Sequence, residues 1–147
     1  MSLLKKDRGF SLIEAVLSIA LIGVGLVGIV YSFQGAARSS LLADQTVIAT
    51  NLARETLEKI IAYKNTNGYN NTLTTININN NYDENPVSGF SNYVIDATAL
   101  EVDSDDDDNV DDFLDAFPGS GYARVTVNIS WDNGNHSINL ATLITDY

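Results

Sequence analysis

The sequence contains no cysteine, one histidine and two prolines among its 147 residues. Without cysteine there is no disulfide framework and no thiol catalysis. Zinc sites usually draw on cysteine or on several histidines, and His136 stands alone. Any Ser-His-Asp arrangement would also have to use His136, and no serine lies in a nucleophile elbow. The composition therefore argues against an enzyme.

Basic residues are scarce as well. Eight Lys and Arg against 19 Asp and Glu give a formal net charge of −11, and residues 65–123 contain no Lys or Arg. Nucleic-acid binding needs a basic surface that neutralises phosphates, so this charge argues against a nucleic-acid partner. If about the first 35 residues form a membrane anchor, roughly 110 residues remain for a soluble part, which is enough for one modest core.

The longest apolar run covers residues 10–33. Its polar members are Ser11, Glu14, Ser18 and Ser32. About 20 apolar residues cross a bilayer as a helix, so the run predicts a transmembrane segment. The preceding residues 1–9 carry three basic side chains, which predict a cytoplasmic N-terminus and a periplasmic C-terminal body. An ordinary signal peptide is the alternative, but it would have a shorter apolar region followed by a small-residue cleavage site.

Glu14 is the unusual residue of this run. A carboxylate near the bilayer centre costs a few kcal/mol, and an acidic residue within a span is by default a candidate functional residue. The alternative is that Glu14 lies near the interface and reaches water. That alternative does not account for the residues around it.

Those residues resemble a known motif. The string RGFSLIE, which runs from Arg8 to Glu14, resembles the prepilin cleavage motif of type IV pilins and of type II secretion pseudopilins. In that family a membrane peptidase cuts after the glycine and methylates the new N-terminus. The resemblance implies cleavage between Gly9 and Phe10, so that Phe10 becomes the first residue of the mature chain and Glu14 the fifth.

The resemblance also implies a role for Glu14 in assembly. Cleavage leaves a cationic amine on Phe10, and Glu14 lies one helical turn further along. In a filament, Glu14 can face the Phe10 amine of an adjacent subunit, because pairing relieves the cost of burying each charge alone. The implied partners are other pilin subunits, through the N-terminal helix, and the prepilin peptidase, with the inner membrane holding the chain before assembly.

Helical periodicity continues beyond the apolar run. Residues 36–62 contain no proline or glycine, and apolar residues recur there at helical spacing. They are Leu42, Ala49, Ala53, Leu57 and Ile60. We therefore predict one helix of about 50 residues, from near Phe10 to near Tyr63, with an apolar first half and an amphipathic second half. Residues 65–93 are rich in Asn, Thr and Gly, which predicts a loop with short strands around residues 73–78.

The C-terminal residues alternate as strands do. Residues 123–131 place apolar side chains at every second position, and Asn133-Gly134 is a strong hairpin turn signal. With that turn, Ile129 faces Ile138 and Val127 faces Leu140. Residues 93–99 supply a further strand. The predicted fold class is α+β: a long N-terminal helix packed on a small antiparallel β-sheet that ends in a hairpin, with Trp131 at least partly buried.

Three segments follow from these patterns: a prepilin leader at 1–9, a transmembrane and filament-core helix at 10–35, and a periplasmic globular domain at 36–147.

The terminal hairpin and the string LARETLEKI at 52–60 resemble V-type minor pilins, the pilus-modification proteins, and I-type minor pseudopilins. The implied function is a minor structural subunit of a type IV pilus. The alternatives are a minor pseudopilin of a type II secretion system and a permanently anchored periplasmic calcium-binding or sensor module.

Residues 101–115 contain nine acidic side chains. Four of them alternate like the oxygen ligands of a calcium loop: Asp103, Asp105, Asp107 and Asp111. The pattern departs from the EF-hand, since Asp108 replaces the usual glycine and Leu114 the usual glutamate. We predict one Ca²⁺ at these residues. The alternative is a solvated acidic loop whose like charges repel.

Overall fold

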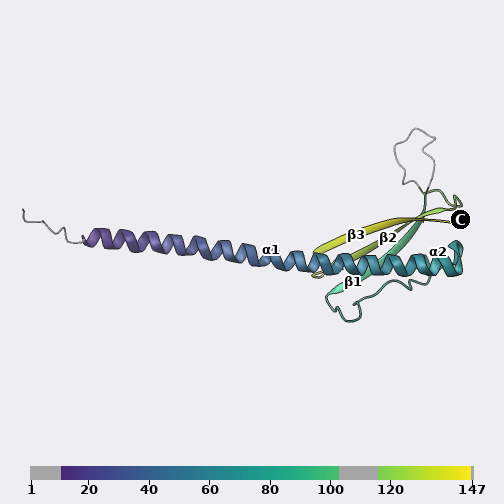
Figure 1. Ribbon diagram of the computed structural model, residues 1–147, viewed down its shortest axis with the longest axis horizontal. Helices are drawn as coiled ribbons and strands as arrows, with labels where there is room; N and C mark the ends of the chain where they lie inside the picture. Colours follow the sequence, from purple (N-terminus) through teal and green to yellow (C-terminus); the bar gives the residue numbers. More distant parts are fainter. Residues whose placement is uncertain (1–10, 103–115, 147) are drawn as a thin grey trace, which may run out of the picture. The chain divides into compact units, whose positions relative to one another are not determined.

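The computed structural model describes residues 11–102 and 116–146. Along the chain lie α1 (Leu12–Asn67), α2 (Tyr69–Asn77), β1 (Tyr93–Glu101), β2 (Tyr122–Trp131) and β3 (His136–Thr145) (Figure 1). The chain divides into two compact units, Met1–Ala43 and Asp44–Tyr147, and α1 runs from one into the other. The α+β class predicted from the sequence is confirmed.

The single long helix is also confirmed, and it ends at Asn67 rather than near Tyr63. The polar residues of its last turn had suggested a loop. Instead, Thr66 Oγ1 donates to the Ala62 carbonyl at 3.1 Å and Asn67 Nδ2 donates to the Tyr63 carbonyl at 3.2 Å. The helix ends where Gly68 takes a φ of 85°, a left-handed conformation that glycine adopts at no steric cost.

The predicted loop with short strands is wrong for residues 69–77, which form helix α2. Four of its residues are buried at helical spacing: Tyr69, Thr72, Thr75 and Ile76. Two threonine hydroxyls donate to carbonyls four residues back, Thr72 to Gly68 at 2.8 Å and Thr74 to Asn70 at 3.0 Å. These bonds satisfy the polar side chains that made the segment look like a loop, and burial supplies the rest of its stability.

The three strands form one antiparallel sheet in the order β1-β2-β3. Ile129 pairs with Ile138 and Val127 with Leu140, so the predicted register is confirmed. The turn is wider than the predicted two residues, since the strands end at Trp131 and His136. Three successive residues of this turn have positive φ, namely Asp132, Asn133 and Gly134. Asp, Asn and Gly are the residue types that tolerate the left-handed region best, which lets this turn form.

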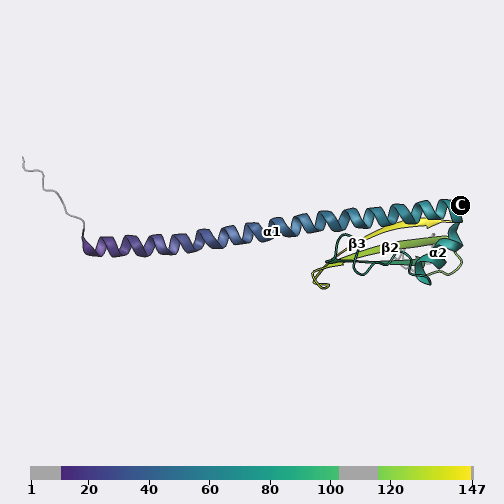
Figure 2. The same ribbon diagram turned by 90° about the horizontal axis from the view of Figure 1, so that it is seen from below.

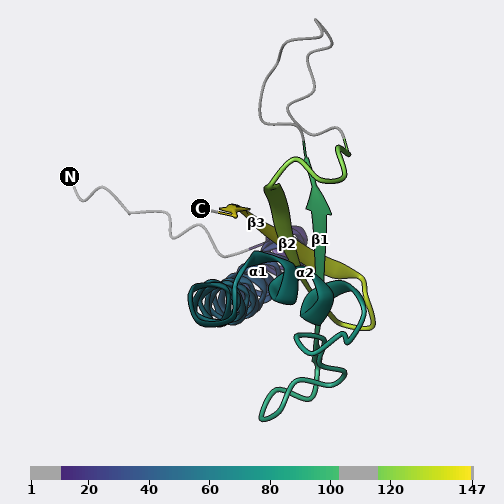
Figure 3. The ribbon, with the colours of Figure 1, turned by 90° about the vertical axis from the view of Figure 1, so that its right-hand side faces the viewer.

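The core of the second unit lies between the sheet and the second half of α1, which run alongside each other (Figures 2 and 3). Strand β2 contributes Ala123, Val125, Val127, Ile129 and Trp131 to this core. Helix α1 contributes Ala49, Leu52, Ala53, Leu57 and Ile60. Trp131 is 4% exposed, as predicted from the alternation. Leu42, predicted to lie on the same stripe, is 40% exposed and lies outside this core.

Gln45 joins the start of this helical half to the sheet by two long-range hydrogen bonds. Its side-chain oxygen accepts from Trp131 Nε1 at 3.2 Å, and its backbone carbonyl accepts from the Tyr93 hydroxyl at 3.3 Å. Both aromatic residues are buried, and each bond gives the polar atom of a buried ring a partner. These contacts fix the end of the sheet against the helix.

Candidate functional site: the N-terminal helix and the acidic segment

The first turn of α1 holds the predicted assembly residue. The helix begins at Leu12, and the Ala15 amide donates to the Ser11 carbonyl at 3.1 Å. Glu14 lies in this turn, where the positive end of the helix dipole favours a carboxylate. Its side chain is exposed, and it has no ion-pair partner in the part of the chain that the structure describes. Gly9 and Phe10, the predicted processing residues, lie outside the described residues.

Two serines within the apolar segment satisfy their hydroxyls inside the helix. Ser18 donates to the Glu14 carbonyl at 2.7 Å, and Ser32 donates to the Gly28 carbonyl at 3.0 Å. In hydrocarbon an unsatisfied hydroxyl is costly, so such bonds make a serine tolerable in an apolar span. Glu14 is the only charged residue from Leu12 to Phe33. Its charge, unlike the serine hydroxyls, needs a partner from outside the helix.

The large apolar side chains of this segment have no cover within the chain. From Leu12 to Phe33 each of them is at least 53% exposed. Twenty-two helical residues rise about 33 Å, against about 30 Å for the hydrocarbon core of a bilayer. Among the described residues, α1 is the one helix long and apolar enough to cross a membrane. So much apolar surface requires lipid or other helices around it.

One side of the segment carries a shallow groove of about 520 Å³. Its lining is Gly25, Gly28, Ile29, Ser32, Phe33 and Ala36. A Cβ placed on Gly25 or Gly28 would meet no atom within 4 Å, so packing within the chain does not require glycine at either position. Gly28, Ser32 and Ala36 are small residues at four-residue spacing, which lets helices approach closely in membranes. The groove is thus suited to a neighbouring helix.

Comparison with known families bears on this same segment. Residues 4–30 match the family model of the prokaryotic N-terminal methylation motif, and this range includes Gly9, Phe10 and Glu14. Neither the comparison with curated proteins nor that with solved structures finds a match.

The motif and the α+β fold with its long N-terminal helix support a type IV pilin-like protein. More specifically, the motif supports a pilin or pseudopilin that is processed by prepilin peptidase and assembles with other pilins. Proteins of this kind are structural and not catalytic. The motif and the apolar helix are also consistent with an inner-membrane anchor that later enters a filament.

The acidic segment lies between β1 and β2, and the predicted calcium ligands Asp103, Asp105, Asp107 and Asp111 are outside the described residues. The residues that flank them are described. Val102 and Ala116 form an antiparallel bridge, and the Phe117 amide donates to the Glu101 carbonyl at 2.9 Å. The two ends of the segment therefore meet. In the described part of the chain, no three or more acidic or histidine side chains form a group that could hold a metal ion.

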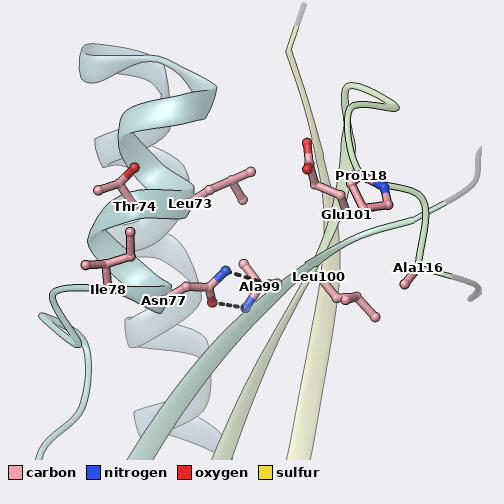
Figure 4. A pocket seen from close by; sticks show the side chains of 9 residues that line it. All are labelled: Leu73, Thr74, Asn77, Ile78, Ala99, Leu100, Glu101, Ala116 and Pro118. Carbon is pink, nitrogen blue, oxygen red and sulfur yellow. Dashed lines mark hydrogen bonds between the residues drawn. The ribbon is translucent and has the colours of Figure 1, made fainter.

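Glu101 has a role that its place in an acidic run did not reveal. One oxygen of its carboxylate accepts from the Tyr69 hydroxyl at 3.2 Å, and the other accepts from the Gly119 amide at 3.1 Å. Burial, together with the nearby Glu101 carboxylate, raises the pKa of the Tyr69 phenol. Glu101 thus connects α2 to Gly119, which follows the acidic segment in the chain. Glu101 also lines a shallow cavity of about 340 Å³ (Figure 4).

Proposed function

We propose that this chain is a minor structural subunit of a type IV pilus, with its C-terminal unit in the periplasm before assembly. One observation carries the proposal: Glu14, which has no ion-pair partner among the described residues, lies in the first turn of a helix whose large apolar side chains are all exposed from Leu12 to Phe33. In a bundle of such helices the apolar surfaces cover one another. Glu14 then meets the Phe10 amine of an adjacent subunit, so that each charge is offset.

The minor role and the periplasmic orientation rest on sequence features. The leader is basic, which favours a cytoplasmic N-terminus and an external body. The terminal hairpin resembles those of pilus-modification proteins. The same hairpin also resembles those of I-type minor pseudopilins, so a secretion pseudopilus is the second candidate function.

Fractionation of the native assembly distinguishes these functions. We expect an epitope-tagged full chain to appear in filaments sheared from the cell surface, at a small fraction of the major subunit, and its deletion to reduce piliation. A deletion that abolishes protein secretion, while surface filaments lack the chain, would assign it to a pseudopilus. A chain that stays in the membrane at its full precursor mass would instead indicate a permanently anchored module.

We also propose that the acidic segment binds one Ca²⁺ through Asp103, Asp105, Asp107 and Asp111. Carboxylates at alternate positions are the hard oxygen ligands that calcium prefers. The bridge between Val102 and Ala116 supports the proposal, because it brings the two ends of the segment together. No Lys or Arg between residues 65 and 123 is available to offset their repulsion, and a divalent ion would offset it.

The calcium proposal predicts a change in thermal stability. An ion that binds only the folded state adds RT ln(1 + [L]/Kd), about 2.7 kcal/mol at a hundredfold excess over Kd. We expect Tm in millimolar calcium to exceed Tm in chelator by several degrees, and magnesium to do less because it requires a tighter octahedral shell. Differential scanning calorimetry of the full chain in detergent measures this.

A charge-matched pair of variants controls for general electrostatics. Asp105→Asn with Asp107→Asn should abolish the calcium effect. Asp44→Asn with Asp96→Asn removes the same charge from exposed positions elsewhere and should keep the effect. An equal Tm of the unaltered chain in calcium and in chelator, with no saturable binding by titration calorimetry, would refute the calcium proposal. The segment would then be a solvated acidic loop.

A further inference from the structure

The two edges of the sheet differ in how their backbone groups are satisfied. At the β1 edge, the Ile95 amide donates to the Glu84 carbonyl at 2.9 Å, and the Glu84 amide returns a bond to the Ile95 carbonyl at 3.1 Å. Tyr93 likewise donates to Phe90 and accepts from Val87, both at 2.9 Å. The chain that precedes β1 thus covers the first part of this edge.

Side chains cover the rest of the β1 edge. Asp83 Oδ1 accepts from the Ala97 amide at 2.9 Å. The Asn77 amide group of α2 makes two bonds to Ala99, accepting from its N–H at 2.9 Å and donating to its carbonyl at 2.8 Å (Figure 4). Each outward-facing amide of β1 from Tyr93 to Ala99 therefore has a partner, which is how native sheets prevent unwanted pairing.

The register identifies the corresponding groups on β3. In an antiparallel ladder, the backbone groups of successive residues point alternately to the two sides of the strand. Odd-numbered residues of β1 point outward, and the observed register carries this alternation across β2 to β3. The outward-pointing groups of β3 are those of Ser137, Asn139, Ala141 and Leu143. Within residues 11–102 and 116–146, none of these four amides has a hydrogen-bond partner.

The composition of β3 leaves this edge unprotected. From Ser137 to Thr145 there is no charged residue, no proline and no glycine, and the strand is ten residues long. Exposed edges in native sheets are usually short, bulged, or marked by lysine or proline. On the side facing the core, Ile138 and Leu140 are only partly buried, and on the other side Leu143 is 46% exposed. An added strand would cover apolar side chains on both faces.

A second copy of this sheet does not fit the edge within one filament. Continuation from β3 of one copy to β1 of the next is blocked, because the β1 edge is already bonded. A β3–β3 pair related by a two-fold axis perpendicular to the strands would be antiparallel, and that axis would reverse, in one copy, the direction of the second half of α1, which packs on the sheet. Helices that enter the same membrane from the same side cannot be reversed in this way.

We propose that the free edge of β3 binds an extended strand from a different subunit of the same filament. The inference rests on the proposed function, since the filament is where such a subunit is met. The strand would pair with Ser137, Asn139, Ala141 and Leu143 through its backbone. Apolar side chains at every second position would lie beside Ile138 and Leu140, as in other cases of strand addition.

Amide exchange in the native assembly tests the pairing. Hydrogen–deuterium exchange with residue-level fragmentation compares the full chain in detergent with the chain in sheared filaments. We expect the four outward amides of β3 to exchange at least about tenfold more slowly in filaments, while Ile138, Leu140 and Thr142 are protected in both states. Equal exchange of the four amides in both states would overturn the proposal.

A pair of lysine variants tests the same edge by incorporation. Ala141 and Thr98 are exposed and lie in one cross-strand row through Thr126, at opposite edges of the sheet. Ala141→Lys should reduce recovery in filaments severalfold, whereas Thr98→Lys places the same charge on the bonded edge and should leave recovery unchanged. Both variants should remain processed and folded.

The outcomes separate the failure of this inference from that of the function. Wild-type recovery of Ala141→Lys in filaments would overturn the strand-binding inference alone. Absence of the unaltered chain from filaments would overturn both the inference and the pilus function. A dimer in detergent that Ala141→Lys dissociates would assign the edge to a second copy and overturn the inference.

Discussion

Replacement of Gly9 by leucine should leave the whole precursor uncut in the membrane, whereas the unaltered chain should yield a mature protein that begins at Phe10. The methylation motif at residues 4–30 supports processing by prepilin peptidase, and the resemblance implies a cut directly after Gly9. A bulky side chain at the residue before the cut would obstruct the peptidase. Intact mass and N-terminal sequencing of the purified membrane form measure the result, including the added methyl group.

Gly35→Leu is the matched control for this prediction. The change is the same in size, and a Cβ at Gly35 meets no atom within 4 Å, so the helix accepts it. Gly35 also lies outside the matched motif. We expect this variant to be cut as efficiently as the unaltered chain. A mature N-terminus at Met1, or one directly after the small-residue string Gly35-Ala36-Ala37 as an ordinary signal peptide would give, would contradict the pilin-like interpretation of the leader.

Glu14→Ala should be cut and inserted normally but should be lost from filaments by at least about tenfold. The substitution leaves the Phe10 amine of the adjacent subunit without its partner in an apolar bundle. Breaking a buried pair by removing one member costs about 3–5 kcal/mol, and 1.4 kcal/mol already corresponds to tenfold. Quantitative immunoblotting of sheared filaments against the membrane fraction measures the loss.

Glu58→Ala and Glu14→Gln sharpen the Glu14 prediction. Glu58 is exposed on the second half of the same helix, so its removal should leave incorporation unchanged. Glu14→Gln keeps the shape and the hydrogen-bonding oxygen but removes the charge, and it should fail almost as completely as alanine if charge pairing is the cause. Recovery of Glu14→Ala at wild-type levels would refute the pairing.

Much of the fold could be predicted because it depends on short-range patterns. The apolar run and the helical spacing of Ala49, Ala53 and Leu57 predict α1, since a 3.6-residue period is visible within a few turns. The pairing of Ile129 with Ile138 follows from alternation and a turn signal only a few residues apart. The motif around Gly9 and Glu14 is likewise contiguous, so one sequence is sufficient to recognise it.

Helix α2 shows where this kind of inference fails. Asn and Thr favour loops because their side chains compete for backbone hydrogen bonds. Here the threonine hydroxyls bond within the helix, and Tyr69 and Ile76 gain burial against residues distant in sequence. Residues 69–77 therefore owe their conformation to packing that the segment itself does not encode.

The sequence alone determined the anchor helix, the processing motif, the position of Glu14 and the register of the hairpin. The tertiary structure decided that Gln45 bonds Trp131, that Glu101 bonds Tyr69, and that one edge of the sheet is covered while the other has no partner among the described residues. The first set depends on residues within a few turns or one hairpin, where periodicity and turn chemistry act. The second set depends on contacts between separate elements, and the Glu101–Tyr69 and Gln45–Trp131 bonds join residues 32 and 86 positions apart, which only a folded core brings together.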